Sequence, residues 1–243
     1  ANSPAKVTAA GVSEPINLSY LVDGNTVTLT EDITVPAASD AGAKVYEVSS
    51  GDITIDLDGH TINVADGGAV VSQSAVFSIT SSGKLTVKNG TINGNKGVRS
   101  IFRVESGSSA SEYALTLEDV NALNDPTGTG WNPDESAVYV FGPSKVKINR
   151  GSLSSSQCAL SINGANVTDA TIVEADGTSI TGGVLVSCNN ANKGAINLKN
   201  CTVSTEQTYG VRISGGTLQL EGTTIRNNSK NPAASAIVFG LGG

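Results

Sequence analysis

The chain has 243 residues, of which 28 are glycine, none is methionine and 4% are aromatic. This composition, which is also rich in Ser, Thr, Asn and Val, favours many short strands joined by tight polar turns and argues against a mainly helical fold. The formal net charge is -7 and no Lys/Arg cluster or long apolar run is present, which excludes nucleic acid as a partner and insertion into a membrane.

The first strand-like segments follow an N-terminal stretch of mixed character. We expect residues 1–23 to cap the open end of the fold, because an exposed sheet edge templates aggregation. The main domain is expected over residues 24–243, and it opens with the strand pair "GNTVTLTEDITV" at residues 24–35. The lack of any methionine indicates a mature chain or an excised piece of a longer protein.

A first strand motif then recurs eight times along the chain, at intervals between 22 and 36 residues. It reads "VYEV" at its first occurrence and "AIVF" at its last. These segments end at Val48, Ile79, Val104, Val140, Ile162, Val186, Ile213 and Phe239.

A second motif follows each of the first seven occurrences, and it begins with "IDLDGHTI" and "LTVKNGTI". One column of this motif is apolar: Leu57, Val87, Leu117, Ile148, Val167, Leu198 and Leu220. A neighbouring column consists mostly of residues that readily take positive φ: Gly59, Asn89, Asp119, Arg150, Asp169, Asn200 and Gly222. This column predicts one sharp backbone corner in each repeat, displaced onto Gly151 where Arg150 stands.

Strands that recur with a fixed corner and variable connections stack most simply as parallel rungs of a coil. We therefore predict an all-β, single-domain, right-handed parallel β-helix of about eight rungs with three short strands in each rung. "SAIVFGLGG" starts an eighth first strand and then stops without its second motif, which indicates truncation at the C-terminus.

At this point the chain resembles the pectate-lyase-like β-helix superfamily, and in particular the β-helix segments of bacterial surface and adhesin proteins. The resemblance is carried by "GNTVTLTEDITV", "ITIDLDGHTI" and "LTVKNGTI", and it covers the chain from about residue 24 onward. It implies the fold. It does not select a function, because the superfamily shares its scaffold among many chemistries.

The stretch "ITIDLDGHTI" contains the single histidine of the chain and two aspartates. In the gap-free alignment Asp58 heads an outward column that continues with Lys88 and Glu118, which predicts a charge-compensated surface ladder. Asp56 heads a second column in which no other carboxylate follows, and His60 falls just past the corner. We therefore predict no catalytic residue, no metal site and no cofactor.

The enzymes of similar fold supply two signatures that this chain matches only in part. Polygalacturonan hydrolases carry paired aspartates with Gly-His-Gly, whereas "DGH" is followed here by Thr61. Lyases place an Arg or Lys base beside acidic calcium ligands, whereas Arg103 and Arg212 have no acidic cluster in their own rungs. We expect both arginines to be solvated surface residues. Cys158, Cys188 and Cys201 show no metal-ligand spacing, and we expect buried or half-buried thiols, with one disulfide plus a free cysteine as the alternative.

The longest insertion, "NDPTGTGWNPDES" at residues 124–136, is the candidate binding site. An aromatic face beside carboxylates and amides suits sugar recognition, since the ring stacks on the sugar while polar groups bind its hydroxyls. Trp131 is the leading contact candidate, with folding back onto the coil as the alternative. Its predicted companions are Asp125, Asp134, Glu135 and Tyr139, the last pointing outward from the neighbouring strand.

These features together predict a non-enzymatic extracellular or cell-surface module of a bacterial protein, adhesin-like, that binds glycan or another surface ligand through flank loops. One alternative is a carbohydrate-active enzyme, a lyase or hydrolase of acidic polysaccharide. Another is a phage tailspike-like piece that forms a trimer along its outer face.

Overall fold

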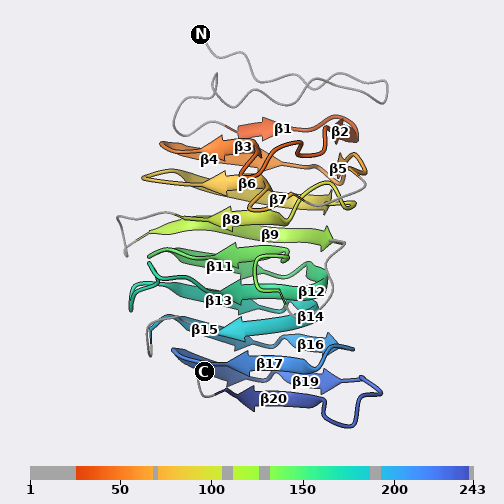
Figure 1. Ribbon diagram of the computed structural model, residues 1–243. Helices are drawn as coiled ribbons and strands as arrows, with labels where there is room; N and C mark the ends of the chain where they lie inside the picture. The colour runs from red at the N-terminus through yellow and green to blue at the C-terminus, as the bar shows by residue number, and fades with distance from the viewer. Residues whose placement is uncertain (1–25, 68–70, 106–111, 126–131, 187–192, 241–243) are drawn as a thin grey trace.

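The structure is a computed structural model that describes residues 26–67, 71–105, 112–125, 132–186 and 193–240. These residues form 20 strands and no helix, and every strand pairing among them is parallel. Figure 1 shows the strands stacked from β1 at one end to β20 at the other. The predicted all-β parallel β-helix is confirmed.

Three parallel sheets run along the solenoid, and four long strands bend at a corner so that each serves two sheets. Sheet 1 consists of β1 (Thr26–Thr28), β4 (Asp52–Asp56), the first halves of β7 (Lys84–Asn93) and β9 (Tyr113–Asn124), β11 (Lys145–Asn149), β13 (Ile172–Asp176), β15 (Ala195–Lys199) and β18 (Thr217–Glu221). Sheet 2 consists of β2 (Ile33–Val35), β5 (Thr61–Val64), the second halves of β7 and β9, the first parts of β12 (Ser152–Ile162) and β14 (Ser179–Val186), β16 (Thr202–Thr205) and β19 (Thr224–Asn227). Sheet 3 consists of β3 (Lys44–Val48), β6 (Ala75–Ile79), β8 (Ser100–Val104), β10 (Val138–Val140), the ends of β12 and β14, β17 (Tyr209–Ile213) and β20 (Ser235–Phe239). Each sheet contains eight strand positions, which correspond to the eight predicted rungs. The coil that passes through them makes about seven turns.

The predicted register of sheet 3 is confirmed along the whole solenoid. Val48 pairs with Ile79, and the pairing continues through each predicted strand end to Phe239. Inside this sheet the rings of Tyr46, Phe77 and Phe102 stack on one another, with centroids 5.0 and 5.5 Å apart. The core is continuous because the same inward position is apolar in successive rungs.

The predicted corner is confirmed in most repeats. Positive φ values occur at Asn89, Asp119, Asn200 and Gly222. Arg150 adopts φ 60° as well, together with Gly151. Its guanidinium forms two hydrogen bonds to the carboxylate of Asp119 one rung away, at 2.7 and 2.6 Å, which helps to hold a residue type that seldom takes this conformation.

Two repeats differ from the gap-free alignment. Sheet 1 pairs Ile148 with Ala175 and places the corner at Gly177, so the prediction of Val167 and Asp169 for these positions is wrong. The segment after Val167 is a turn instead, in which Thr171 donates its N–H to the carbonyl of Thr168. Its alternation of apolar and polar residues mimics a strand locally, but the hydrogen bonds between rungs select the segment that follows.

The first repeat has a corner two residues longer than the others. Ile55 pairs with Val87 and Asp56 with Lys88, whereas Ile62 pairs with Ile92. Leu57 and Asp58 are the additional residues, and Leu57 is fully buried. Asp56, not Asp58, therefore heads the charged ladder, and its carboxylate lies 3.3 Å from the Lys88 ammonium.

Candidate functional site

The stretch around His60 serves the scaffold. The backbone N–H of His60 donates to the carbonyl of Leu57, and its own carbonyl accepts from Thr91 of the next rung. The imidazole Nδ1 lies 3.5 Å from Asp32, whose carboxylate also accepts from the N–H of Thr61. Within the described ranges no three His, Cys, Asp or Glu side chains gather closely enough to hold a metal ion.

The predicted loop site divides into three parts in the structure. Trp131 lies outside the described residues. Asp125 is exposed at the end of β9. Asp134 and Glu135 instead lie together against Arg99, and Tyr139 is 8% exposed on the outer face of sheet 3.

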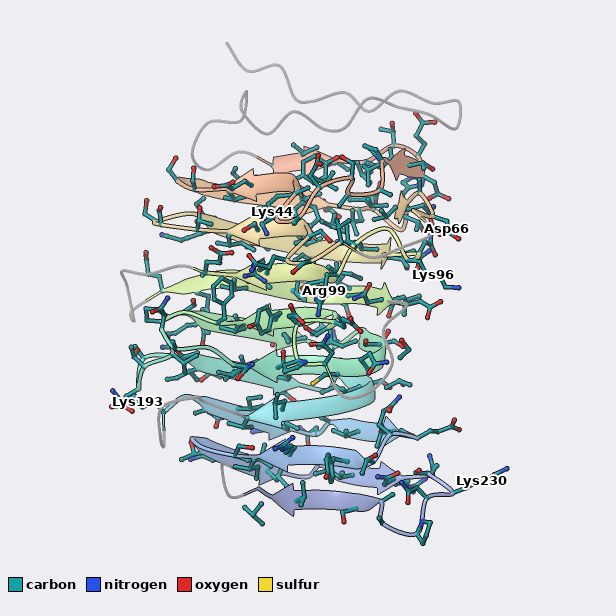
Figure 2. All side chains as sticks on the ribbon, viewed as in Figure 1. Lys44, Asp66, Lys96, Arg99, Lys193 and Lys230 are labelled. Carbon is teal, nitrogen blue, oxygen red and sulfur yellow. The ribbon has the colours of Figure 1, made fainter. Side chains whose placement is uncertain are left out.

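Arg99 binds two of the three carboxylates of the 124–136 insertion. Its Nε lies 2.8 Å from Asp134, and its Nη2 lies 3.6 Å from Glu135. The Glu135 side chain is 6% exposed, and burial raises the pKa of this carboxyl against the opposing effect of Arg99. We call these three residues the Arg99 cluster. Figure 2 shows Arg99 near the middle of the solenoid.

Buried serines hold the backbone beside the Arg99 cluster. Ser100 donates to the carbonyl of Asp134 at 2.8 Å, and Ser155 donates to the carbonyl of Glu135 at 2.7 Å. Ser161 donates to the carbonyl of Pro133 from the outer face of sheet 3. These bonds show that residues 133–135 lie over that face, and the two carboxylates are used there for internal pairing.

Arg103 is also covered, which makes the prediction of a solvated arginine wrong for this residue. Its side chain is 8% exposed, and its Nε lies 2.7 Å from Glu105, an acidic residue of its own rung. The guanidinium lies 4.0 Å from the ring centroid of Phe141 and 5.3 Å from that of Tyr139. Burial raises the pKa of the Tyr139 hydroxyl to about 12, so this ring belongs to a covered cation–π cluster and is not an open platform.

Asp125 lies in a polar groove along the edge of sheet 2, which we call the Asp125 groove. The groove has a volume of about 520 Å³ and continues at Asn95 and Asp125 into a smaller hollow that contains Asp66 and Lys96. Figure 2 shows Asp66 and Lys96 on the same edge of the solenoid. The residues that line the main groove are Asn93, Asn95, Leu123, Asn124, Asp125, Ser154, Ser155, Ser156 and Thr181.

Leu123 gives this groove an apolar contact. It is 39% exposed, and it is the one apolar residue among the outward positions that are paired in the described strands of sheet 2. Its neighbours in the same column are Asn93 and Ser154. The groove therefore combines the apolar side chain of Leu123 with uncharged amides and hydroxyls and with one charged group, the carboxylate of Asp125.

A second groove, the sheet 1 groove, lies on the outer face of sheet 1 and has a volume of about 650 Å³. Glu174 and Asp176 project into it from β13, on either side of Ala175, whose place the sequence alignment gave to Val167. The spacing of the repeats contains the missed signal. Ala175 divides the interval from Ile148 to Leu198 into 27 and 23 residues, both within the range of 22 to 36 found for the first motif, whereas Val167 divides it into 19 and 31, and 19 falls below that range. The groove is lined by Lys147, Asn149, Glu174, Ala175, Asp176, Asn197, Leu198, Lys199, Gln219, Leu220 and Glu221.

Cys158 and Cys201 are free and buried, and Cys188 lies outside the described residues. Burial raises the pKa of both described thiols, which keeps them protonated and poorly reactive.

The described residues contain no helix long and apolar enough to cross a membrane. Comparison of the chain with protein-family models, curated proteins and solved structures gives no match.

Proposed function

We propose that this chain is a non-enzymatic extracellular or cell-surface module that binds glycan through the Asp125 groove. The observation that supports the proposal is the exposed Leu123 side chain set among hydrogen-bonding groups in a concave surface. Sugars are bound by sites of this kind, because their C–H faces contact apolar groups while their hydroxyls exchange hydrogen bonds with amides and carboxylates. The groove also lies where the 124–136 insertion leaves β9.

A rigid scaffold favours such binding. Successive rungs hold the groove residues at fixed separations of about 4.8 Å, so the ligand meets preformed contacts and little backbone has to be ordered. Asn124 is 4% exposed, and its amide donates to the carbonyls of Arg99 and Ser136, which fixes the start of the insertion. Asp134 and Glu135, near the end of the insertion, are held by Arg99, and the carbonyl of Glu135 accepts a hydrogen bond from Ser155 of the groove. The end of the insertion therefore also lies near the groove.

The proposal is tested with a glycan array followed by calorimetric titration of any glycan that binds. Leu123→Thr and Asp125→Ala are each expected to weaken binding about fivefold to tenfold, the effect of one good contact in a partly exposed site. Thr202→Ala removes a hydroxyl from the same face outside the groove and is the matched control. Trp131→Ala tests the sequence prediction for the insertion separately. Binding that survives both groove variants would overturn the placement of the site.

The enzymatic alternative has one specific observation in its favour, since Arg99 lies between two carboxylates. An arginine base must be able to reach substrate, whereas this arginine is already paired and its side chain is 19% exposed. Assays for unsaturated-uronate and reducing-sugar release separate the two functions. Turnover that is lost in Arg99→Met would favour the enzyme, and sedimentation of a trimer would favour the tailspike-like alternative.

A further inference from the structure

The last rung of the described coil leaves the apolar core open. This rung consists of β18, β19 and β20, and each of these strands pairs with only one other described strand. Figure 1 shows β19 and β20 at this end of the stack. Leu220 of β18 is 42% exposed, and Ile237 and Phe239 of β20 are 38% and 78% exposed.

These exposed side chains occupy core positions. Leu220 pairs with Leu198, which is buried in the rung before. Ile237 pairs in the same way with the buried Val211. One other large apolar side chain of the described residues is exposed, and it is Leu123 in the Asp125 groove. Exposed apolar side chains that gather at one place mark an interaction surface.

The edges of the same three strands are open to pairing. Native sheets commonly protect an edge strand with lysine or proline, and β18, β19 and β20 contain neither. A second set of strands that pairs with these edges also covers the core behind them. The surface therefore favours a partner that is itself the open end of a coil, because such a partner supplies three edges and a matching core.

A second copy of this chain fits this surface. Only one end of the described coil is open, because Val27, Ile33 and Tyr46 of the first described rung are buried. A head-to-tail arrangement would set the open end against a closed one, whereas two open ends cover each other. Contact between identical surfaces requires a two-fold axis, and the resulting assembly closes at two copies.

Charge and size support the same arrangement. The chain has a formal net charge of -7, but residues 217–239 contain one acidic residue, Glu221, and two basic residues, Arg226 and Lys230. Two copies therefore meet here without bringing excess negative charge together. A stable interface involves about 20–30 residues on each side, which one rung of this coil supplies.

We propose that two copies of this chain associate end to end through residues 217–240, about a two-fold axis perpendicular to the solenoid. The axis reverses the chain direction, so the free edges meet antiparallel, and Phe239 of each copy is covered by the other copy. The dimer carries two Asp125 grooves and therefore attaches more strongly to a surface that displays many copies of one glycan. The association itself does not depend on glycan binding.

Sedimentation velocity over a range of protein concentrations measures the association, and small-angle X-ray scattering measures the shape. A coil of eight rungs is about 35 Å long, so an end-to-end dimer is expected to exceed the monomer in length by about 35 Å. A dimer no longer than the monomer lies side by side and would overturn the proposal. A trimer, an open-ended series of larger species, or a protein that stays monomeric at every concentration would overturn it as well.

Variants of the last rung locate the interface. Phe239→Ser is expected to raise the dissociation constant of the dimer about thirtyfold or more, the effect of losing a central aromatic contact. Because Phe239 is exposed in the single chain, this variant is expected to keep the fold, and thermal unfolding of dilute protein checks that it does. An unchanged dissociation constant in Phe239→Ser would overturn the proposal.

The matched pair is Leu220→Thr and Leu123→Thr, since these two leucines are 42% and 39% exposed and lie far apart on the coil. Leu220→Thr is expected to weaken the dimer, and Leu123→Thr is expected to leave the association unchanged while it weakens glycan binding. An equal loss of association in both variants would replace the proposal with nonspecific attraction between apolar surfaces. The separate readouts of association and glycan binding keep this test distinct from that of the Asp125 groove.

Discussion

Replacement of Arg99 by methionine tests the described packing of the Arg99 cluster. The change keeps most of the aliphatic volume and removes the charge that lies between Asp134 and Glu135. Removing one partner of a buried ion pair costs about 3–5 kcal/mol, because the remaining charge stays buried. Arg99 is 19% exposed, so we expect the lower end of this range, about 3 kcal/mol. For a chain of this length each kcal/mol lowers the melting temperature by about 2–4 °C, which predicts a fall of about 6–12 °C.

The pH dependence of this loss identifies its cause. Burial already raises the pKa of Glu135 above its ordinary value, and removal of Arg99 takes away an opposing effect. A carboxyl whose pKa is raised by folding binds its proton more tightly in the folded state, so acidification stabilises the variant relative to the wild-type protein. The difference is therefore expected to be largest at neutral pH and to shrink as pH falls through the folded pKa of Glu135.

Thermal unfolding followed by circular dichroism at several pH values measures both effects. Lys230→Met is the control, since it removes an exposed cation and is expected to change stability by less than about 0.5 kcal/mol. Arg99→Met/Asp134→Asn/Glu135→Gln removes the unpaired charges and should recover much of the loss. If Arg99→Met melts like the control, or if its deficit is the same at every pH, then these groups are not paired as described.

Three further predictions follow from the same structure. Gly177→Ala should lower the free energy of unfolding, measured with denaturant, by about 1 kcal/mol or more because Gly177 has φ 64°, whereas Asp169→Ala should leave it nearly unchanged. The reverse order would show that the corner lies at Asp169, as the sequence alignment predicted. Burial alone would raise the pKa of Asp56, but hydrogen bonds from Asn89 and from the N–H of Asp58, together with Lys88, lower it below its ordinary value of 3.8. The Asp56 carboxylate therefore stabilises the fold above its unfolded pKa, and this stabilisation is lost as pH falls through the folded pKa. An NMR titration that gave this carboxyl an ordinary or raised pKa would contradict the prediction. Native spectrophotometric titration should find a tyrosine that ionises at about pH 12 and is missing in Tyr139→Phe. If the substitution instead removes a tyrosine that ionises near its ordinary pKa, the Tyr139 ring is exposed.

The sequence predicted the fold because the relevant signals are local. Alternation of apolar and polar residues defines each strand, and a residue that tolerates positive φ defines each corner, as at Asn89 and Asn200. All eight strand ends in sheet 3 were predicted in register, since each is an apolar residue that closes a similar short motif. These features depend on neighbours along the chain and need no knowledge of the distant contacts.

The candidate sites were less predictable. Asp134 and Glu135 were identified as residues of the insertion, but their pairing with Arg99 depends on a segment that returns across the solenoid. Glu174 and Asp176 were missed because one wrong repeat moved both of them off the outer face of sheet 1. An error of this kind leaves the fold intact and changes every side chain that a groove presents.

The amino-acid sequence by itself determined that this chain coils into parallel rungs, where the rungs turn, and which faces are apolar. The tertiary structure alone decided which of two similar segments joins sheet 1, that Arg103 and Tyr139 are covered, and where polar groups form grooves. The physical reason is that strand and corner preferences act within a few residues, whereas register, burial and charge pairing are set by hydrogen bonds and packing between rungs more than 20 residues apart in the chain.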